Sequence, residues 1–204
     1  MKENIQLVIK IAFLAIFIFL VVTGRVQLWM GVFLVSVAAS LLLGRIYCGW
    51  ACPINTGMNG VTWLKKKLHI KGLKTPQLFT KPWIRYLFLG LFIATFIMTI
   101  VTGKKIPALP ALFAAGIILT FFFPEELWHR YFCPYGTILS LPASKAKYSM
   151  SIDQERCNSC GACIQSCPAE AFDKNEKQYI INKSDCLVCL DCSIKCTHDT
   201  ISYT

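Results

Sequence analysis

The segment CNSCGACIQSCP, residues Cys157–Pro168, sets four cysteines in the pattern C-x2-C-x2-C-x3-C-P. The segment CLVCLDCSIKCT, residues Cys186–Thr197, repeats this spacing and ends in threonine instead of proline. Three thiolates at such a spacing can surround one iron–sulfur cubane, while the fourth cysteine reaches the other cluster. The paired motif therefore predicts two 4Fe–4S clusters.

The crossed fourth cysteine assigns the ligands of each cluster. The predicted ligands are Cys157, Cys160, Cys163 and Cys196 for cluster 1, and Cys186, Cys189, Cys192 and Cys167 for cluster 2. Zinc sites usually pair C-x2-C units across a longer gap, and disulfides do not last in a reducing cytoplasm. Electron relay is the predicted role, with cluster assembly or a purely structural role as the alternative.

The residues around the two motifs predict a small α+β domain. SMSID (Ser149–Asp153) and KQYIIN (Lys177–Asn182) have the composition of short strands. Two cubanes on such a duplicated scaffold resemble a bacterial ferredoxin with two 4Fe–4S clusters. That resemblance covers residues 149–204.

The preceding residues have a different character. The chain of 204 residues is 55% hydrophobic, and its net charge of +10 comes from the first 148 residues, because the cysteine-rich end is acidic. A bilayer core needs about 20 apolar residues of helix. The predicted spans are Ile5–Val22, Val26–Gly44, Trp83–Thr102 and Pro107–Phe123. The predicted fold is thus an all-α membrane half of four helices, in two tandem hairpins, followed by the ferredoxin-like domain.

Basic residues in the connections predict the orientation. One side holds Lys2, Lys10, Arg45, Lys65, Lys66, Lys67, Lys71, Lys74, Lys81, Arg85, Arg130, Lys145 and Lys147, and the other holds Arg25, Lys104 and Lys105. We expect a multi-pass protein of the cytoplasmic (inner) membrane with both termini in the cytoplasm. A cleaved signal peptide is the weaker interpretation of the first segment, since no good cleavage site follows it.

Two charged features have simple interpretations. Lys10 can reach the headgroups from a helix end, with an ion pathway as the alternative. The run Trp63–Lys74 mixes lysines with apolar residues and predicts contact with membrane lipids, or with an acidic partner. No motif for nucleic acid is present, so nucleic acid is not an expected partner.

The membrane half contains a tandem pattern. CGWACP (Cys48–Pro53) follows the first pair of spans, and HRYFCP (His129–Pro134) follows the second. Duplicated hairpins would bring Cys48, Cys52, His129 and Cys133 together at one cytoplasmic rim. A third metal or iron–sulfur centre is the hypothesis for these residues, and small buried hydrophobic cysteines are the alternative.

These features resemble the NapH-type membrane ferredoxins, a group that includes NosR-type and CcoG-type polyferredoxins. The resemblance implies a quinol dehydrogenase membrane component that exchanges electrons between the quinone pool and another redox subunit or soluble carrier. The expected domains are a first hairpin (1–44), a basic loop with CxxxCP (45–82), a second hairpin (83–124), a linker with HxxxCP (125–148) and the ferredoxin domain (149–204).

His129 departs from the group's pattern, which has cysteine there. Imidazole can replace thiolate at iron, and histidine changes charge near neutral pH. His129 is therefore a candidate ligand or a candidate quinone and proton site, and the alternatives are a lost site or a hydrogen-bonded neighbour of headgroups. Glu125 and Glu126 are interpreted as a helix-end charge pair, with proton transfer as the alternative.

Two other functions fit the same residues. A cytoplasm-facing cupric ion reductase would bind copper at Cys48, Cys52 and Cys133, because soft thiolates suit Cu(I). A redox-sensing regulatory or assembly membrane protein is the other. The sequence has no G-x-G-x-x-G fingerprint and no C-x-x-C-H motif, so neither a dinucleotide nor c-type haem is indicated.

Overall fold

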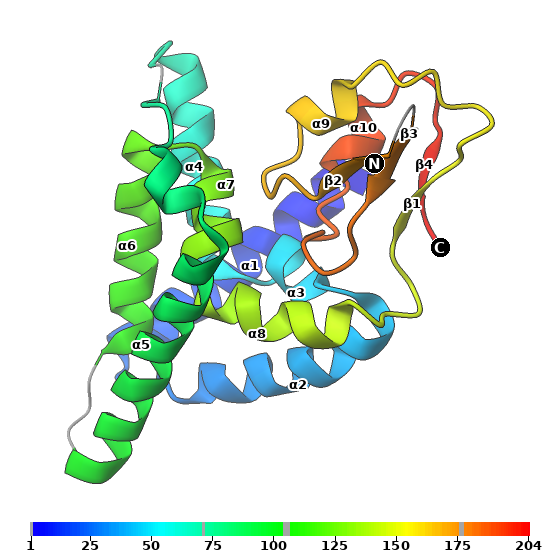
Figure 1. Cartoon of the computed structure of the whole chain (residues 1–204). Coiled ribbons are helices and arrows are strands. Elements are labelled where there is room, and N and C mark those ends of the chain that lie inside the picture. The colour runs from blue at the N-terminus through cyan, green and yellow to red at the C-terminus, as the bar shows by residue number, and fades with distance from the viewer. Residues whose placement is uncertain (1, 71, 104–106, 176–177) are drawn as a thin grey trace.

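The computed structural model describes residues 2–70, 72–103, 107–175 and 178–204. Lys71, Lys104 and Lys105, which entered the orientation prediction, and Lys177, the first residue of a predicted strand, lie outside these residues. Helices make up the first part of the chain and short strands appear only after residue 149 (Figure 1). This order agrees with a helical part followed by a small α+β part.

The helical part contains more elements than two hairpins. Its elements are α1 (Lys2–Val22), α2 (Leu28–Leu43), α3 (Ile46–Trp50), α4 (Pro53–Lys67), η1 (Gln77–Thr80), α5 (Pro82–Thr102), α6 (Ala108–Phe122), α7 (Glu125–Leu127), the π-helical turn η2 (Trp128–Phe132) and α8 (Pro134–Ala143). Residues 45–82, expected as a basic loop, are therefore largely helical.

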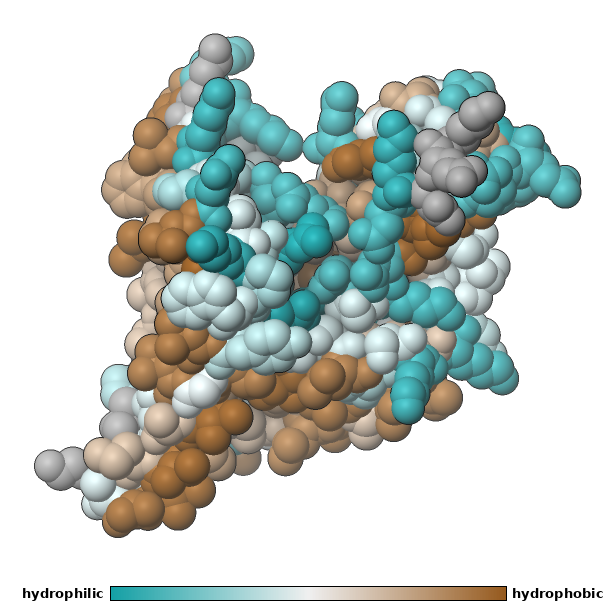
Figure 2. All heavy atoms as spheres, in the orientation of Figure 1, coloured by the Kyte–Doolittle hydropathy of each residue, from teal (hydrophilic) through white to brown (hydrophobic). Residues whose placement is uncertain are grey.

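The prediction of four spans is only partly supported. Among the described residues, α1 and α5 are long and apolar enough to cross a bilayer, and few of their side chains are buried. The other two predicted spans form the shorter apolar helices α2, of 16 residues, and α6, of 15 residues. Prolines flank α6 at Pro107 and Pro124 and limit its length. Figure 2 shows apolar side chains gathered over the lower part of the molecule, as expected of a membrane protein.

The two halves of the helical part exchange packing partners. The most extensive contacts join α4 to α6 and α2 to α8, while α1 also packs on α4 and α5 on α8. In Figure 1, α2 runs across the direction of α5 and α6. Gly57 and Gly116 allow the close approach of α4 and α6, since a Cβ at either glycine would lie 2.7 Å from an isoleucine side chain of the other helix.

The two Cys-Pro steps have the same local structure. Cys52 and Cys133 are extended residues, with φ of −72° and −79°, directly before α4 and α8. Pro53 and Pro134 occupy the first position of each helix, where the absent N–H costs no hydrogen bond. The repeated sequence pattern thus produces a repeated turn.

The C-terminal domain has two antiparallel pairs of strands. Its elements are β1 (Met150–Ile152), α9 (Ala162–Gln165), β2 (Phe172–Asn175), β3 (Gln178–Ile181), α10 (Asp191–Lys195) and β4 (Ile201–Tyr203). Strand β1 pairs with β4, and β2 pairs with β3. Leu187 and Ala169 from this domain belong to the same buried core as Cys48 and Trp128, so the two parts share one core.

Candidate functional site

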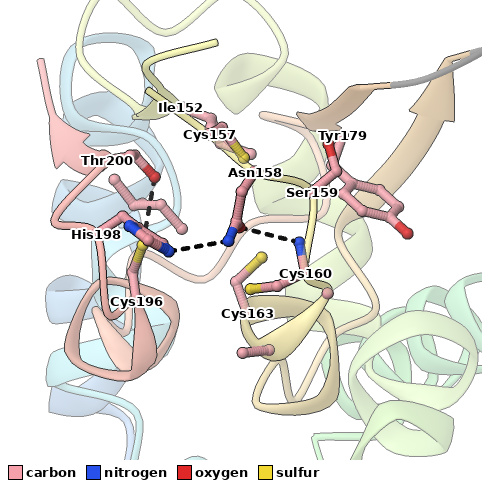
Figure 3. Close-up of a pocket in the computed structure, with 13 residues that line it drawn as sticks. Ile152, Cys157, Asn158, Ser159, Cys160, Cys163, Tyr179, Cys196, His198 and Thr200 are labelled. Carbon is pink, nitrogen blue, oxygen red and sulfur yellow. Dashed lines mark hydrogen bonds between the residues drawn. The ribbon is translucent and has the colours of Figure 1, made fainter. Parts of the chain in front are cut away.

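One pocket, which we call the outer cysteine pocket, is lined by one predicted quartet. Cys157, Cys160, Cys163 and Cys196 all face it. Figure 3 shows their sulfur atoms around the side chain of Asn158, which bonds the His198 ring at 2.9 Å and accepts from the Cys160 amide at 3.2 Å. Cys160 is exposed, so this pocket lies near solvent.

A second pocket, the inner cysteine pocket, is lined by the other quartet. Cys167, Cys186, Cys189 and Cys192 all face it, among apolar side chains. Burial raises the pKa of the Cys186 thiol to about 11 and that of Cys192 to about 12. The amides of Val188 and Ala171 donate to the Cys186 and Cys167 sulfurs at 3.5 and 3.4 Å. Hydrogen bonds to sulfur are one means by which a protein sets a cluster's potential.

The loops that line the two pockets have matching backbones. Ser159 and Gly161 in the outer loop have positive φ, and Val188 and Leu190 have positive φ at the equivalent places of the inner loop. A β-branched or bulky residue is strained in this conformation and keeps it only when its surroundings require it. The positive φ of Val188 and Leu190 is therefore a strained conformation, as expected in a loop that is fixed to bind a ligand.

The inner loop rests directly on the first Cys-Pro segment. Trp50 Nε1 donates to the Val188 carbonyl at 3.0 Å, and Gln6 Nε2 donates to the carbonyls of Gly49 and Cys189 at 3.3 and 3.0 Å. A Cβ at Gly49 would lie 2.4 Å from the Leu187 carbonyl oxygen. The close approach therefore requires glycine at this position.

The structure brings three of the four predicted rim residues into one cluster. Cys48, Cys52 and Cys133, which we call the rim cysteines, are buried in the core of the helical part. Burial and then the Cys48 and Cys133 thiols raise the pKa of Cys52, while burial and then Cys48 raise that of Cys133 to about 11. The Cys133 sulfur also accepts from the Gly136 amide at 3.3 Å. Three buried thiols that act on one another in this way are suited to a shared positive centre.

His129 is buried beside this cluster. Burial and then the Arg45 guanidinium lower the pKa of His129 to about 3, so the imidazole is neutral at pH 7. Its Nε2 is buried and has no hydrogen-bond partner. A neutral ring with an unpaired nitrogen is the form that binds metal, whereas proton uptake at neutral pH is disfavoured.

Arg45 is the site residue that sequence reasoning missed. Its side chain is only 1% exposed. Nη1 donates to the carbonyls of Ser184 and Asp185 at 3.1 and 3.3 Å, and Nη2 lies 3.9 Å from the Cys48 sulfur. Arg45 thus links the rim cysteines to the start of the inner loop. Its position between an apolar span and the CxxxCP motif could have marked it as a site residue. A basic residue at this position is also common at an ordinary helix end.

The described part of the chain has no group of three or more His, Cys, Asp or Glu side chains arranged around a single metal ion. This applies to the two pockets and to the rim cysteines with His129. A cubane spreads its thiolates around a larger body than one ion.

Comparison with sequence families agrees with this geometry. A family described as 4Fe–4S binding domain matches residues 27–71 and again 105–150, which are the two repeats with their Cys-Pro steps. A second family with the same description matches residues 150–173. The double match supports the tandem pattern of the helical part.

Similar proteins come from bacteria and archaea. An uncharacterized protein of Methanocaldococcus jannaschii is 27% identical over 84% of this chain and 69% of its own length. The ferredoxin-type protein NapH of Escherichia coli is 25% identical over 85% of this chain and 67% of its own length. The regulatory protein NosR of Pseudomonas aeruginosa is 26% identical over 77% of this chain and 24% of its own length.

The NapH proteins and MauN of Methylobacillus flagellatus are named as ferredoxin-type proteins, and the family matches cover both Cys-Pro repeats and the first cysteine motif. The identities are modest, between 23% and 28%. The matches and the relatives together support a place for this chain among the NapH-like membrane 4Fe–4S ferredoxins.

Proposed function

We propose that this protein transfers electrons between the quinone pool and a redox partner through two 4Fe–4S clusters. The observation that carries the proposal is the pair of pockets, each lined by one crossed cysteine quartet. Cys157, Cys160, Cys163 and Cys196 would hold one cluster, and Cys167, Cys186, Cys189 and Cys192 the other. Such clusters supply one-electron chemistry when bound.

The surroundings of the pockets support an order of transfer. The inner pocket lies against the membrane half, since Cys167 and Cys189 pack on the core that contains the rim cysteines. The outer pocket faces solvent at Cys160. We assign exchange with a membrane carrier to the inner side and exchange with a partner protein or soluble carrier to the outer side.

The membrane arrangement is part of the proposal. Four crossings, with α2 and α6 as short spans, would place both termini and the ferredoxin domain in the cytoplasm. The basic residues after α2 and around α4 support this orientation. We extend the proposal to a third centre held by Cys48, Cys52, His129 and Cys133, supported by the unpaired Nε2 of His129.

Metal analysis tests the proposal. Iron and acid-labile sulfide are measured on protein purified without oxygen, beside a Cys48→Ser/Cys133→Ser variant. Two cubanes require about eight iron atoms per chain. More than eight in the native protein, falling to eight in the variant, supports a third centre, and equal values contradict it. A native value well below eight contradicts the two clusters themselves.

The copper reductase alternative has less support in the structure. The three rim cysteines are between 5% and 8% exposed. A substrate ion would have to enter a closed core to reach them. Copper-dependent oxidation of the reduced protein would nevertheless favour that function over a regulatory one.

A further inference from the structure

A cleft separates the helical part from the ferredoxin domain. It has a volume of about 990 Å³ and lies between α4 and α7 on one side and α9 and α10 on the other. Figure 2 shows this hollow between the two lobes, edged by hydrophilic side chains. Its lining on the membrane side includes Trp63, Ile70 and Leu73, while Cys167 and Asp191 line the domain side.

A buried polar chain ends at this cleft. Glu125 lines the cleft and is 8% exposed. With the amide of Asn59 oriented to satisfy both of its ends, Asn59 donates to Glu125 Oε2 and accepts from Lys10 Nζ, each at 3.2 Å. Lys10 is 8% exposed, so it does not extend to the headgroups as the sequence suggested. The bond from Asn59 holds the carboxylate in place. The carboxylate can still accept further hydrogen bonds from a molecule in the cleft.

The cleft also reaches the inner cysteine pocket. Cys167 lines both cavities. An occupant of the cleft therefore meets a buried carboxyl group on one wall and a proposed cluster ligand on the other. His129, the candidate quinone site, and the rim cysteines are buried and offer no such open surface.

We propose that this cleft binds the headgroup of a hydroquinone and that Glu125 accepts a hydrogen bond from one of its hydroxyl groups. The inference rests on the proposed function and gives it a location. Trp63 and the apolar residues Ile70 and Leu73 suit an aromatic ring that arrives from the membrane. Burial raises the pKa of Glu125 above its ordinary value, which is common among carboxyl groups at functional sites.

Binding of a fluorescent quinol analogue tests the site. The probe is 2-heptyl-4-hydroxyquinoline N-oxide, whose quenching is titrated against the purified full-length protein. We expect Glu125→Gln to weaken binding about tenfold, because the uncharged amide oxygen accepts a weaker hydrogen bond than a carboxylate does. Ile194→Trp, at an exposed position that lines the cleft, should weaken it by filling the space. Glu155→Gln, an exposed carboxylate elsewhere, is the matched control and should not change binding.

Equal affinity in the native protein and in both cleft variants would overturn the inference, as would the absence of binding to the native protein. Iron content and the electron paramagnetic resonance signal of the reduced protein are measured on the same samples. About eight irons without cleft-dependent binding would reject the cleft and leave the proposed function standing. Cleft-dependent binding with little iron would reject the two clusters and keep the ligand site.

Discussion

The inner and outer cysteine pockets have the same cysteine spacing and different surroundings. The inner pocket is covered by the helical part, and its Cys186 and Cys192 thiols are buried. The outer pocket has exposed Cys160, and although slight burial raises the pKa of Cys196, its hydrogen bond with Thr200 lowers that pKa overall. A duplicated motif thus produces one internal site and one surface site, because only one copy docks on the membrane half.

The largest effect should come from the buried cation beside the inner pocket. Arg45→Met leaves the carbonyls of Ser184 and Asp185 without their donor, and each acceptor left unsatisfied on burial costs about 1–3 kcal/mol. We expect the inner pocket to lose the cluster proposed for it, so that iron falls from the proposed value of about eight to about four per chain. Arg156→Met, next to the outer pocket, is the control and should retain the iron. Full iron in both variants would contradict the role of Arg45.

The contact between Gly49 and the inner loop predicts the next effect. Gly49→Ala forces a methyl group against the Leu187 carbonyl, and overpacking of this kind costs about 1–3 kcal/mol. We expect a lower Tm and faster proteolysis between the helical part and the ferredoxin domain. Gly60→Ala is the comparison, because a Cβ there meets nothing within 4 Å, and it should stabilise slightly. The same Tm change in both would reject the close contact.

One ion pair lies next to the first cysteine of each motif, and the two pairs differ in burial. Arg85 pairs with Asp185 at 3.2 Å, with side chains 19% and 14% exposed, while Arg156 pairs with Asp153 at 3.1 Å, with side chains 61% and 46% exposed. Arg85→Met should cost about 1–2 kcal/mol, and Arg156→Met about 0–1 kcal/mol. Thermal unfolding in detergent measures both. A larger loss of stability in Arg156→Met than in Arg85→Met would contradict the assignment of the buried pocket as inner and the exposed pocket as outer.

The smallest effect is a pH dependence on the inner side. Burial raises the pKa of Glu125 above its ordinary value; Asp191 and Glu126 raise it further, and Thr62 and Lys66 lower it. The folded state therefore holds this proton more tightly, and stability is lost as pH rises from about 4.3 through the folded pKa. Glu125→Gln should flatten the fall in Tm across that range by a few degrees. Glu155→Gln should keep the native slope, and an unchanged slope in Glu125→Gln would contradict the prediction.

The ferredoxin domain and the repeat were the predictable features. Cysteine spacing reflects the shape of a cluster, so the grouping of the quartets in two pockets could be anticipated from the chain. Short strands at Met150–Ile152 and Gln178–Ile181 also lie within the expected segments. The cysteine spacing and the composition of the strands are local features of the sequence, so they can be recognised without knowledge of long-range contacts.

The docking of the two parts could not be predicted in the same way. In the sequence, Arg45 and Lys65 look like ordinary basic residues at a membrane surface. In the structure, Arg45 is buried and Lys65 donates to the buried Thr120 carbonyl at 2.9 Å. Their partners lie more than 50 residues away in the chain. The burial of His129 near Arg45 also depends on contacts between residues that are distant in the sequence.

The exchanged packing of the repeats has a consequence for how the protein is made. Helix α4 belongs to the first repeat, but its principal partner α6 is synthesised later. Until α6 is synthesised, the face of α4 that packs on α6 is uncovered, although Met58 of α4 is fully buried in the finished protein. Neither half of the helical part can complete its own packing alone, so folding of the first half has to wait for synthesis of the second.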